Sequence, residues 1–226
     1  MKQKLFLVLS ALFLAACSTP ASQPENDGAS APAKETTGGE TGSWSDHSIL
    51  IAYFTMPEDT GTDTSSSASR VAADGEVLGN TEYIARLIQQ ESGGDLFAIE
   101  TKQTYPDDHD ALTDLAYEEQ AEAARPTLRQ AADVEGYDII FLGFPNWWGD
   151  LPMPLYTFLE ETDLSGKTII PFVTHGGNGF SATVDTIASL QPQASVSDQG
   201  LSISRNDVSD AQGTVSEWLS GLEASL

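Results

Sequence analysis

Residues 137–154 read YDIIFLGFPNWWGDLPMP, a short apolar run that leads directly into two adjacent tryptophans bracketed by glycine and proline. The first six residues are typical of a strand covered on both faces. Glycine and proline then exclude regular structure. Because burying a large aromatic side chain stabilises a fold by about 1.5–3 kcal/mol, indoles are expected inside. In this loop they either fold back into the core or form a platform for a flat aromatic ligand, and the loop alone does not decide between the two.

Strand-like and helix-like patterns alternate on both sides of this stretch. Apolar runs typical of strands cover residues 49–54, 96–99, 137–142, 167–173 and, more weakly, 200–204. Helical patterns cover residues 81–91, 110–132, 154–161, 181–190 and 208–222, with Pro126 starting a new turn or a kink in the second of them. Five strands alternating with five helices predict an α/β domain with a mainly parallel sheet.

One connection is much longer than the others in this alternating pattern. Residues 55–79 separate the first strand from the first helix, far more than the usual two to six residues of such a loop. Within it, Asp74-Gly75 lies between two short, partly apolar arms, which is a hairpin signal. The sequence predicts an inserted β-hairpin after the first strand.

The first 17 residues have the pattern of a secretory signal peptide. Lys2 and Lys4 precede an apolar run at 5–16, about 18 Å long as a helix and too short for a ~30 Å hydrocarbon core. The end of the run, Leu-Ala-Ala-Cys17, resembles the lipobox of bacterial lipoproteins, in which the cysteine carries a lipid such as palmitate. We therefore expect an exported chain, anchored to the cell membrane or cell surface through Cys17. The alternative is an ordinary signal peptide cut elsewhere.

Residues 18–47 are rich in Ser, Thr, Pro, Gly and Glu and contain almost no large apolar side chain. Such a segment buries too little surface to order itself, so we predict a tether that averages roughly 30 Å from end to end. The folded domain is then expected to cover residues 48–226, a length suited to one well-cored domain.

Composition excludes several classes of function. With 34 acidic and 10 basic residues the formal net charge is −24, which argues against a nucleic-acid partner. Cys17 is the only cysteine, so no internal disulfide or thiolate cluster is expected. His47, His109 and His175 are far apart in sequence and lack metal-ligand spacing. We expect no metal site.

Ligands of parallel α/β sheets bind beyond the carboxyl ends of the strands, so the loops after the first, third and fourth strands carry the candidate site. The first loop contains Thr55 and Met56, and it ends in Gly79, Asn80 and Thr81, which open the first helix. A helix N-terminus with nearby hydroxyls suits a phosphate group. The alternative is a plain helix cap by Asn80 or Thr81.

The second of these loops is the tryptophan loop, residues 145–149. Pro145 and Gly149 fix its path, Trp147 or Trp148 offers an aromatic face, and Asn146 can hydrogen-bond the edge of a ligand.

The third is the glycine-rich loop, residues 174–180, in which three glycines allow backbone N–H groups to approach a ligand closely. No Ser or Cys nucleophile lies at a recognisable spacing from His175, so we interpret this histidine as a hydrogen-bonding group. The candidate ligand-binding residues of this loop are Thr174, His175, Gly176, Gly177, Asn178 and Phe180.

A phosphate cup, an aromatic platform and a glycine-rich edge suit a ligand with one phosphate and a flat polar ring, and FMN fits that description. With these loops the chain resembles the flavodoxin family, in particular flavodoxin-like bacterial proteins with Pro-Asn-Trp-Trp-Gly and Thr-His-Gly-Gly loops. The resemblance implies a three-layer sandwich, a five-stranded parallel sheet of order 2-1-3-4-5, and FMN as the cofactor. It places the start of the family's phosphate loop at Thr55 and its end at residues 79–81, with the hairpin between them.

The resemblance also implies that Trp147 or Trp148 stacks on the flavin. The glycine-rich loop lacks the tyrosine that many flavodoxins stack on the outer face, so either Phe180 or His175 replaces it or that face is open.

Three functions remain open at this point. The leading hypothesis is a membrane-tethered FMN protein that carries electrons to a redox partner the sequence does not identify. The second is an FMN-dependent reductase of quinones or other small acceptors, and the third is a non-redox ligand-binding module. The lack of a nicotinamide fingerprint such as Gly-x-Gly-x-x-Gly mildly favours the carrier.

Overall fold

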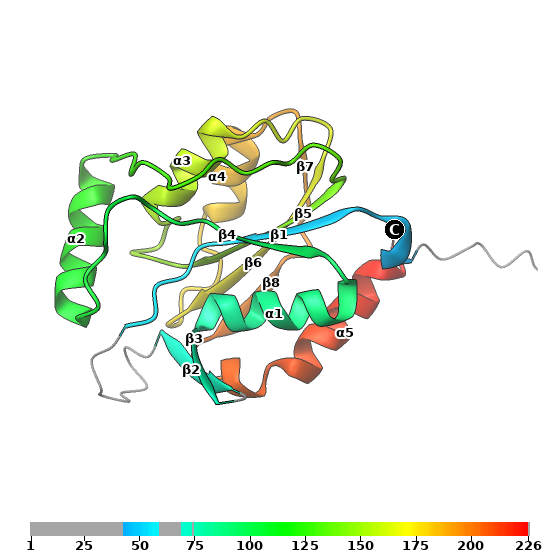
Figure 1. Cartoon of the computed structure of the whole chain (residues 1–226), viewed down its shortest axis with the longest axis horizontal. Helices are drawn as coiled ribbons and strands as arrows, with labels where there is room; N and C mark the ends of the chain where they lie inside the picture. The colour runs from blue at the N-terminus through cyan, green and yellow to red at the C-terminus, as the bar shows by residue number, and fades with distance from the viewer. Residues whose placement is uncertain (1–42, 59–68, 74, 226) are drawn as a thin grey trace, which may run out of the picture. The chain divides into compact units, whose positions relative to one another are not determined.

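The computed structural model describes residues 43–58, 69–73 and 75–225. Its central sheet is parallel throughout and is drawn in Figure 1, with the strands β1 (Ile49–Tyr53), β4 (Asp95–Ala98), β5 (Ile139–Pro145), β6 (Thr168–His175), β7 (Ser195–Val196) and β8 (Leu201–Ser204). The strand order is β4-β1-β5-β6, and both β7 and β8 pair with β6. The predicted order 2-1-3-4-5 is confirmed.

The fifth position of the sheet is divided between two short strands. The two residues of β7 pair with Thr168 and Ile169, whereas β8 pairs with residues 172–175. The sequence predicted only the second piece, because Ser195-Val196 is too short to show an apolar pattern.

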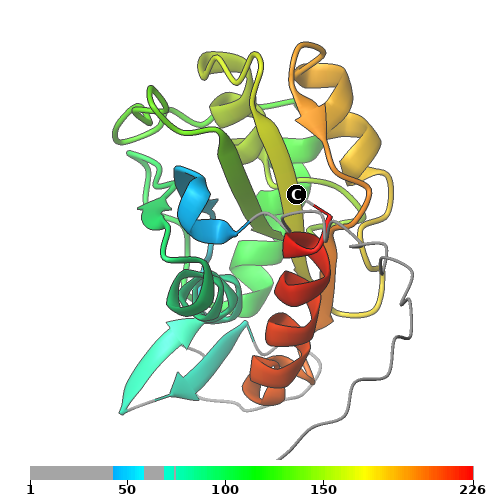
Figure 2. The ribbon, with the colours of Figure 1, turned by 90° about the vertical axis from the view of Figure 1, so that its right-hand side faces the viewer.

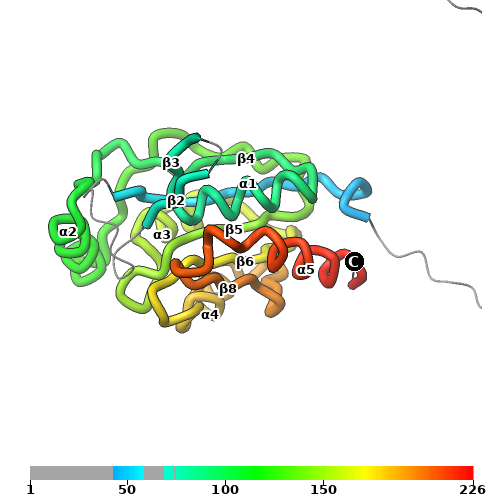
Figure 3. Tube along the Cα trace, turned by 90° about the horizontal axis from the view of Figure 1, so that it is seen from below, coloured from blue at the N-terminus to red at the C-terminus, as the bar shows by residue number. Residues whose placement is uncertain are grey.

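Helices cover both faces of the sheet. On one face lie α1 (Asn80–Ser92) and α5 (Gln212–Glu223), which cross the sheet side by side in Figure 3. On the other side lie α2 (His109–Ala121), α3 (Met153–Glu161) and α4 (Thr183–Leu190) (Figure 1). This is the predicted three-layer sandwich.

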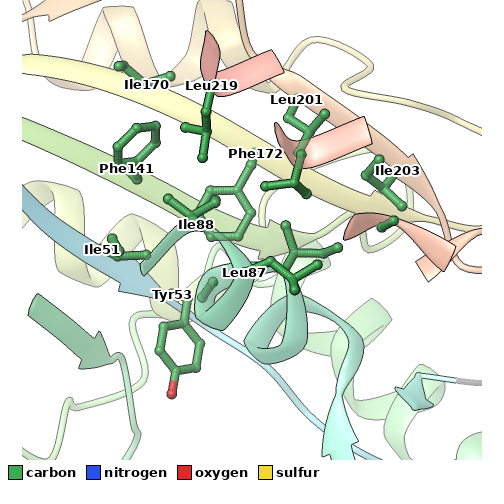
Figure 4. Close-up of a cluster of buried hydrophobic side chains, with 14 of the residues drawn as sticks. Ile51, Tyr53, Leu87, Ile88, Phe141, Ile170, Phe172, Leu201, Ile203 and Leu219 are labelled. Atoms are coloured by element: carbon green, nitrogen blue, oxygen red, sulfur yellow. The ribbon is translucent and has the colours of Figure 1, made fainter. Parts of the chain in front are cut away.

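Side chains that point alternately to the two faces of β5 contribute to both hydrophobic cores. Phe141 points to the α1 and α5 face, where it joins Ile88, Phe172 and Leu219 (Figure 4). Leu142 points to the opposite face and joins the cluster of α2, α3 and α4. Successive strand residues face opposite sides, so a run that is apolar throughout requires helices on both.

The predicted helix over 110–132 is wrong beyond Ala121. Ala123 has a φ of 49°, in the left-handed region that ends helices. The chain then runs beside residues 100–102: the amide of Lys102 donates to Thr127 O at 2.9 Å, and that of Arg129 donates to Glu100 O at 2.7 Å. Pro126, which disfavours helix in the residue before it, precedes this pairing.

Two short strands lie between β1 and α1. β2 (Arg70–Ala73) and β3 (Glu76–Gly79) pair antiparallel around Gly75, whose φ of 83° suits a tight turn (Figure 2). β3 runs directly into α1 and so delivers the first turn of that helix to the carboxyl end of β1.

The described domain begins before the predicted boundary at residue 48. Trp44 lies in the short helix η1 (Trp44–Asp46), is only 6% exposed, and its ring centroid is 5.6 Å from that of Phe141. Its amide donates to Glu223 Oε1 at 3.0 Å. A single tryptophan in a polar stretch has no periodic pattern, so the sequence missed this contact. The predicted signal peptide, Cys17 and residues 18–42 lie outside the described residues.

In the part of the chain that the structure describes, no helix combines the length and apolar character needed to cross a membrane.

Candidate functional site

A cavity of about 280 Å³ opens at the carboxyl ends of β1, β5 and β6, where α/β sheets of this order bind their ligands. The three predicted loops meet there. Their residues that line the cavity are Thr55, Met56, Asn80, Thr81, Pro145, Asn146, Trp147, Trp148, Thr174, His175, Gly176 and Asn178. Gly79, Gly149, Gly177 and Phe180, which were also predicted, do not line it.

The first turn of α1 faces the cavity, and its N-cap residue carries no capping side chain. The N-cap residue is Gly79, which makes no side-chain bond, so the alternative of a cap by Asn80 or Thr81 is wrong. A Cβ atom at Gly79 would lie 2.0 Å from Thr55 Oγ1, so glycine is what allows the end of β3 to pack on the end of β1. The positive end of the helix dipole and the Thr55 hydroxyl thus lie together, as an anion site requires.

A buried hydroxyl pair joins this turn to the glycine-rich loop. Thr81 Oγ1 and Thr174 Oγ1 are 2.8 Å apart, and the two residues are 1% and 4% exposed. Each hydroxyl combines one donor with two acceptor lone pairs, so the pair retains capacity for a ligand.

The tryptophan loop is a tight turn held from both ends. Trp147 and Asp150 exchange backbone bonds of 3.1 and 3.0 Å, with Trp148 and Gly149 at φ values of 53° and 81° between them. Left-handed φ values are costly for a bulky residue such as tryptophan, so the surrounding contacts must hold the turn.

Asn146 supplies much of that restraint. Its Oδ1 accepts from the Gly149 amide at 2.9 Å, and its Nδ2 donates to Gly179 O at 2.9 Å and to Ser181 Oγ at 3.0 Å. We expected this side chain to bond a ligand edge, but both of its polar atoms are engaged within the protein. Asn146 therefore ties the tryptophan loop to the glycine-rich loop.

The two tryptophans have different surroundings. The ring of Trp147 is partly buried, edge-on to Phe54 at 5.4 Å and to Tyr105 at 5.9 Å. Trp148 is 57% exposed; its Nε1 donates to Thr113 O at 3.1 Å and its ring lies 5.5 Å from Tyr117. Trp147 packs with the core, whereas Trp148 spans from the loop to α2 and keeps much of its surface open.

The glycine-rich loop is shaped by His175. Its Nδ1 accepts from the Gly177 amide at 2.9 Å, which requires Nδ1 to be unprotonated. Burial lowers the pKa of His175, and the nearby Asp207 carboxylate opposes this only in part. A neutral imidazole that holds backbone in place agrees with the interpretation of His175 as a hydrogen-bonding group.

Phe180 does not reach the cavity. Its ring packs against Phe144 at 6.4 Å, and it fills the space beside Gly200, where an added Cβ would meet it at 2.7 Å. The structure therefore does not support a place for Phe180 at the ligand, because its ring covers the α3 and α4 core.

Sequence reasoning missed part of the lining. The additional residues are Glu58, Ser69, His109, Leu112, Thr113, Ala116 and Arg205. Leu112 and Ala116 are one turn apart on α2, a signal too common to single out. Arg205 directly follows the last strand, at the same end of the sheet as the predicted loops, and that position could have identified it.

Two charged groups in this cavity are only partly paired. Glu58 is 8% exposed, and its Oε1 lies 2.9 Å from His109 Nδ1, whereas its Oε2 has no partner among the described residues. Arg205 Nε is likewise buried without a partner in the described part of the chain. Unpartnered buried polar atoms are unfavourable, so they indicate where a ligand's own polar groups would bind.

The chain belongs to the flavodoxin family, since the family model described as flavodoxin matches residues 69–221. Flavodoxin 1 of Salmonella typhimurium is 32% identical over 106 residues, which cover 43% of this chain and 44% of that relative. The chain thus spans less than half the length of this curated relative.

Solved structures share the fold. A flavoprotein from Lactobacillus acidophilus, crystallised in complex with FMN, gives a TM-score of 0.51 at 21% identity, over 74% of this chain and 99% of its own. A putative flavoprotein from Bacteroides uniformis gives 0.54 at 24% identity, over 77% and 98%. One from Bacteroides eggerthii gives 0.52 at 21% identity, over 75% and 98%.

Proposed function

We propose that this chain is an FMN-binding flavoprotein that carries electrons. The observation that supports it most is the convergence of three loops from three separate strands on one cavity, each with the chemistry that a part of FMN needs. When bound, FMN supplies the redox chemistry, and the protein supplies binding, orientation and electrostatics.

The residues present fit this cofactor. The first turn of α1, with Thr55 and Thr81, would hold the phosphate. The glycine-rich loop would present backbone groups to the polar part of the ring, with its path fixed by neutral His175. Glu58 Oε2, which has no partner among the described residues, is placed to accept a hydrogen bond from a ligand hydroxyl.

Trp148 is the tryptophan that we assign to the flavin. Trp147 is fixed by edge-on contacts with two aromatic rings, so it anchors the loop. Trp148 lines the cavity, is 57% exposed, and is oriented by its bond to Thr113 O. A rigid, exposed indole next to a cavity suits offset stacking on a flat ring.

Binding and redox behaviour can be tested on the full chain. The purified apoprotein should acquire the yellow absorption of bound FMN in a one-to-one titration. A carrier should then exchange electrons with a reduced redox protein but react slowly with NADH or NADPH alone in a stopped-flow experiment. A chain that never binds FMN would exclude both a carrier and a flavin-dependent enzyme.

One observation favours a second candidate, an FMN-dependent reductase of quinones or other small acceptors. The cavity extends beyond the three loops to α2, where Leu112 and Ala116 line it next to the Glu58–His109 pair. An apolar wall beside an imidazole would suit a small acceptor that takes up a proton as it is reduced. Rapid reduction of the bound flavin by NADH or NADPH, followed by turnover with a quinone, would favour this candidate.

Attachment to a membrane is a further part of the proposal and rests on the sequence around Cys17. In a bacterial host, the chain should incorporate labelled palmitate and fractionate with membranes. Replacing Cys17 with Ala should abolish both, and a labelled C17A variant would contradict the anchor.

A further inference from the structure

Arg205 lies over the glycine-rich loop. It directly follows β8, and its amide donates to His175 O at 2.8 Å. Its guanidinium crosses Gly176: a Cβ atom at Gly176 would lie 3.0 Å from one Nη and 3.1 Å from Cζ. Glycine at this position therefore leaves the room that the guanidinium occupies at the cavity wall.

The cavity wall brings this guanidinium and the first turn of α1 together. Gly176, which the guanidinium crosses, directly follows β6, two residues after Thr174. Thr81, in the first turn of α1, contacts Thr174 at 2.8 Å. All four residues line the cavity, so the guanidinium of Arg205 and the N-terminus of α1 share its wall.

Arg205 differs from other arginines of the described chain in its pairing. Arg86, Arg125 and Arg129 each form an ion pair with a glutamate on the surface. Arg205 forms no such pair among the described residues, and its Nε is buried without a partner there. In a chain with a net charge of −24, a cation at a cavity wall with no ion pair among the described residues indicates an anionic ligand.

We propose that Arg205 binds the phosphate of the cofactor together with the first turn of α1, an inference that rests on the proposed function. A guanidinium offers a planar pair of donors that matches a phosphate. Neutral hydroxyls and amides bind a phosphate without matching its charge, whereas Arg205 supplies a full positive charge. This arginine would therefore make the cavity select FMN over riboflavin, which has the same ring and no phosphate.

The test is a titration of the full-length apoprotein with FMN and, separately, with riboflavin, followed by quenching of flavin fluorescence. Arg205→Ala should weaken FMN binding by about tenfold to a hundredfold, as expected for a charge-assisted hydrogen bond. Riboflavin binding should change by no more than about twofold, since the ring contacts are retained. Arg205→Lys should retain part of the FMN affinity.

Arg125→Met is the matched control, because it removes the same charge from a surface pair with Glu160 outside the cavity lining. It should leave both affinities unchanged. Arg205→Gln provides a second variant if the alanine variant does not fold, which far-UV circular dichroism will show.

Three other outcomes would each contradict a different part of the account. Wild-type FMN affinity in the folded Arg205 variants would overturn the role of Arg205 and leave the proposed function standing. Equal losses for FMN and riboflavin would place the guanidinium against the ring and overturn the phosphate assignment. Failure of the wild-type chain to bind FMN would instead contradict the proposed function itself.

Discussion

At the end of the sheet where the strands begin, the Asp138 carboxylate lies 2.6 Å from His47 Nδ1 and accepts from the Ser48 amide at the same distance. At the end where the strands finish, Glu58 Oε2 and Arg205 Nε have no partner among the described residues. Asp95 follows the first pattern, since it accepts from Tyr137 at 2.8 Å. Asp138 and Asp95 at the amino ends are matched within the protein, whereas the carboxyl ends hold polar groups that a ligand can match.

Tryptophan shows the same contrast. Trp44, at the amino ends, is 6% exposed and packs on Phe141. Trp148, at the carboxyl ends, is 57% exposed and held by one hydrogen bond to α2. The same side chain thus contributes to folding at one end and is available for binding at the other, so substitutions at the two ends should affect different measurements.

The largest expected effect is a loss of stability on substitution of Trp44, at the amino ends of the strands. Trp44→Ala should lower the free energy of unfolding by about 3–5 kcal/mol, because it leaves a cavity against Phe141. Urea unfolding measures this loss. The folded variant should bind FMN with wild-type affinity, and a marked loss of affinity would contradict the separation of the two ends.

The next effect distinguishes the two tryptophans of the cavity. Trp148→Ala should weaken FMN binding by about tenfold or more while changing stability little, since the side chain is mostly exposed. Trp147→Ala should instead lower stability by about 2 kcal/mol, because it removes contacts with Phe54 and Tyr105. If Trp147→Ala gave the larger loss of affinity at unchanged stability, the assignment of the two indoles would be reversed.

A smaller, pH-dependent effect on stability is expected from Asp138. Burial disfavours its ionised form, but hydrogen bonds from His47 and Ser48 outweigh burial and hold the pKa of Asp138 below its ordinary value of 3.8. Its stabilising contribution is therefore present above about pH 4 and disappears as the pH falls through the lowered pKa. Asp138→Asn should be less stable than wild type at pH 7, and the two unfolding midpoints should converge at acid pH. A constant difference down to pH 2 would contradict this origin.

The smallest effect concerns His175. Since burial holds its pKa below the ordinary 6.5, the unfolded chain binds a proton there before the folded chain does. The contribution of neutral His175 to stability is complete above pH 6.5 and declines as the pH falls toward the lowered value. Asp207 and Arg205 lie nearby, so His175→Ala is compared with wild type at each pH. The difference between their unfolding midpoints should be larger at pH 8 than at pH 5, and an equal difference would contradict the role of neutral imidazole.

Regular patterns in the sequence predicted most of the fold. The apolar runs at 49–54 and 137–142 correspond to central strands, because a strand covered on both faces has no polar side to interrupt its pattern. The end of α2 escaped prediction, since the pairing of residues 127–129 with residues 100–102 overrides the helical propensity of the segment. The packing of Trp44 was not predicted, because a single tryptophan in a polar stretch forms no periodic pattern.

The candidate site was predictable to the extent that it depends on loops at the carboxyl ends of strands. Trp147 and Trp148 both reached the cavity, but only three-dimensional contacts separate the anchor from the exposed indole. The sequence placed Phe180 at the cavity because an aromatic ring in a glycine-rich loop can face either a ligand or the core. In the structure the ring packs against the core. The position of Arg205 directly after the last strand could have placed it near the site, but its contact with Gly176 emerges only from the register of β6 and β8.

The most direct test of the central claim is an amide-shift map of the labelled full-length apoprotein as FMN is added. The account predicts that the perturbed amides fall at residues 55–58, 79–81, 145–149, 174–178 and 205, at the carboxyl ends of the strands. Amides beside Trp44, Asp95 and Asp138 should not move. Perturbations centred on those amino-end residues, or none at saturating FMN, would contradict the account.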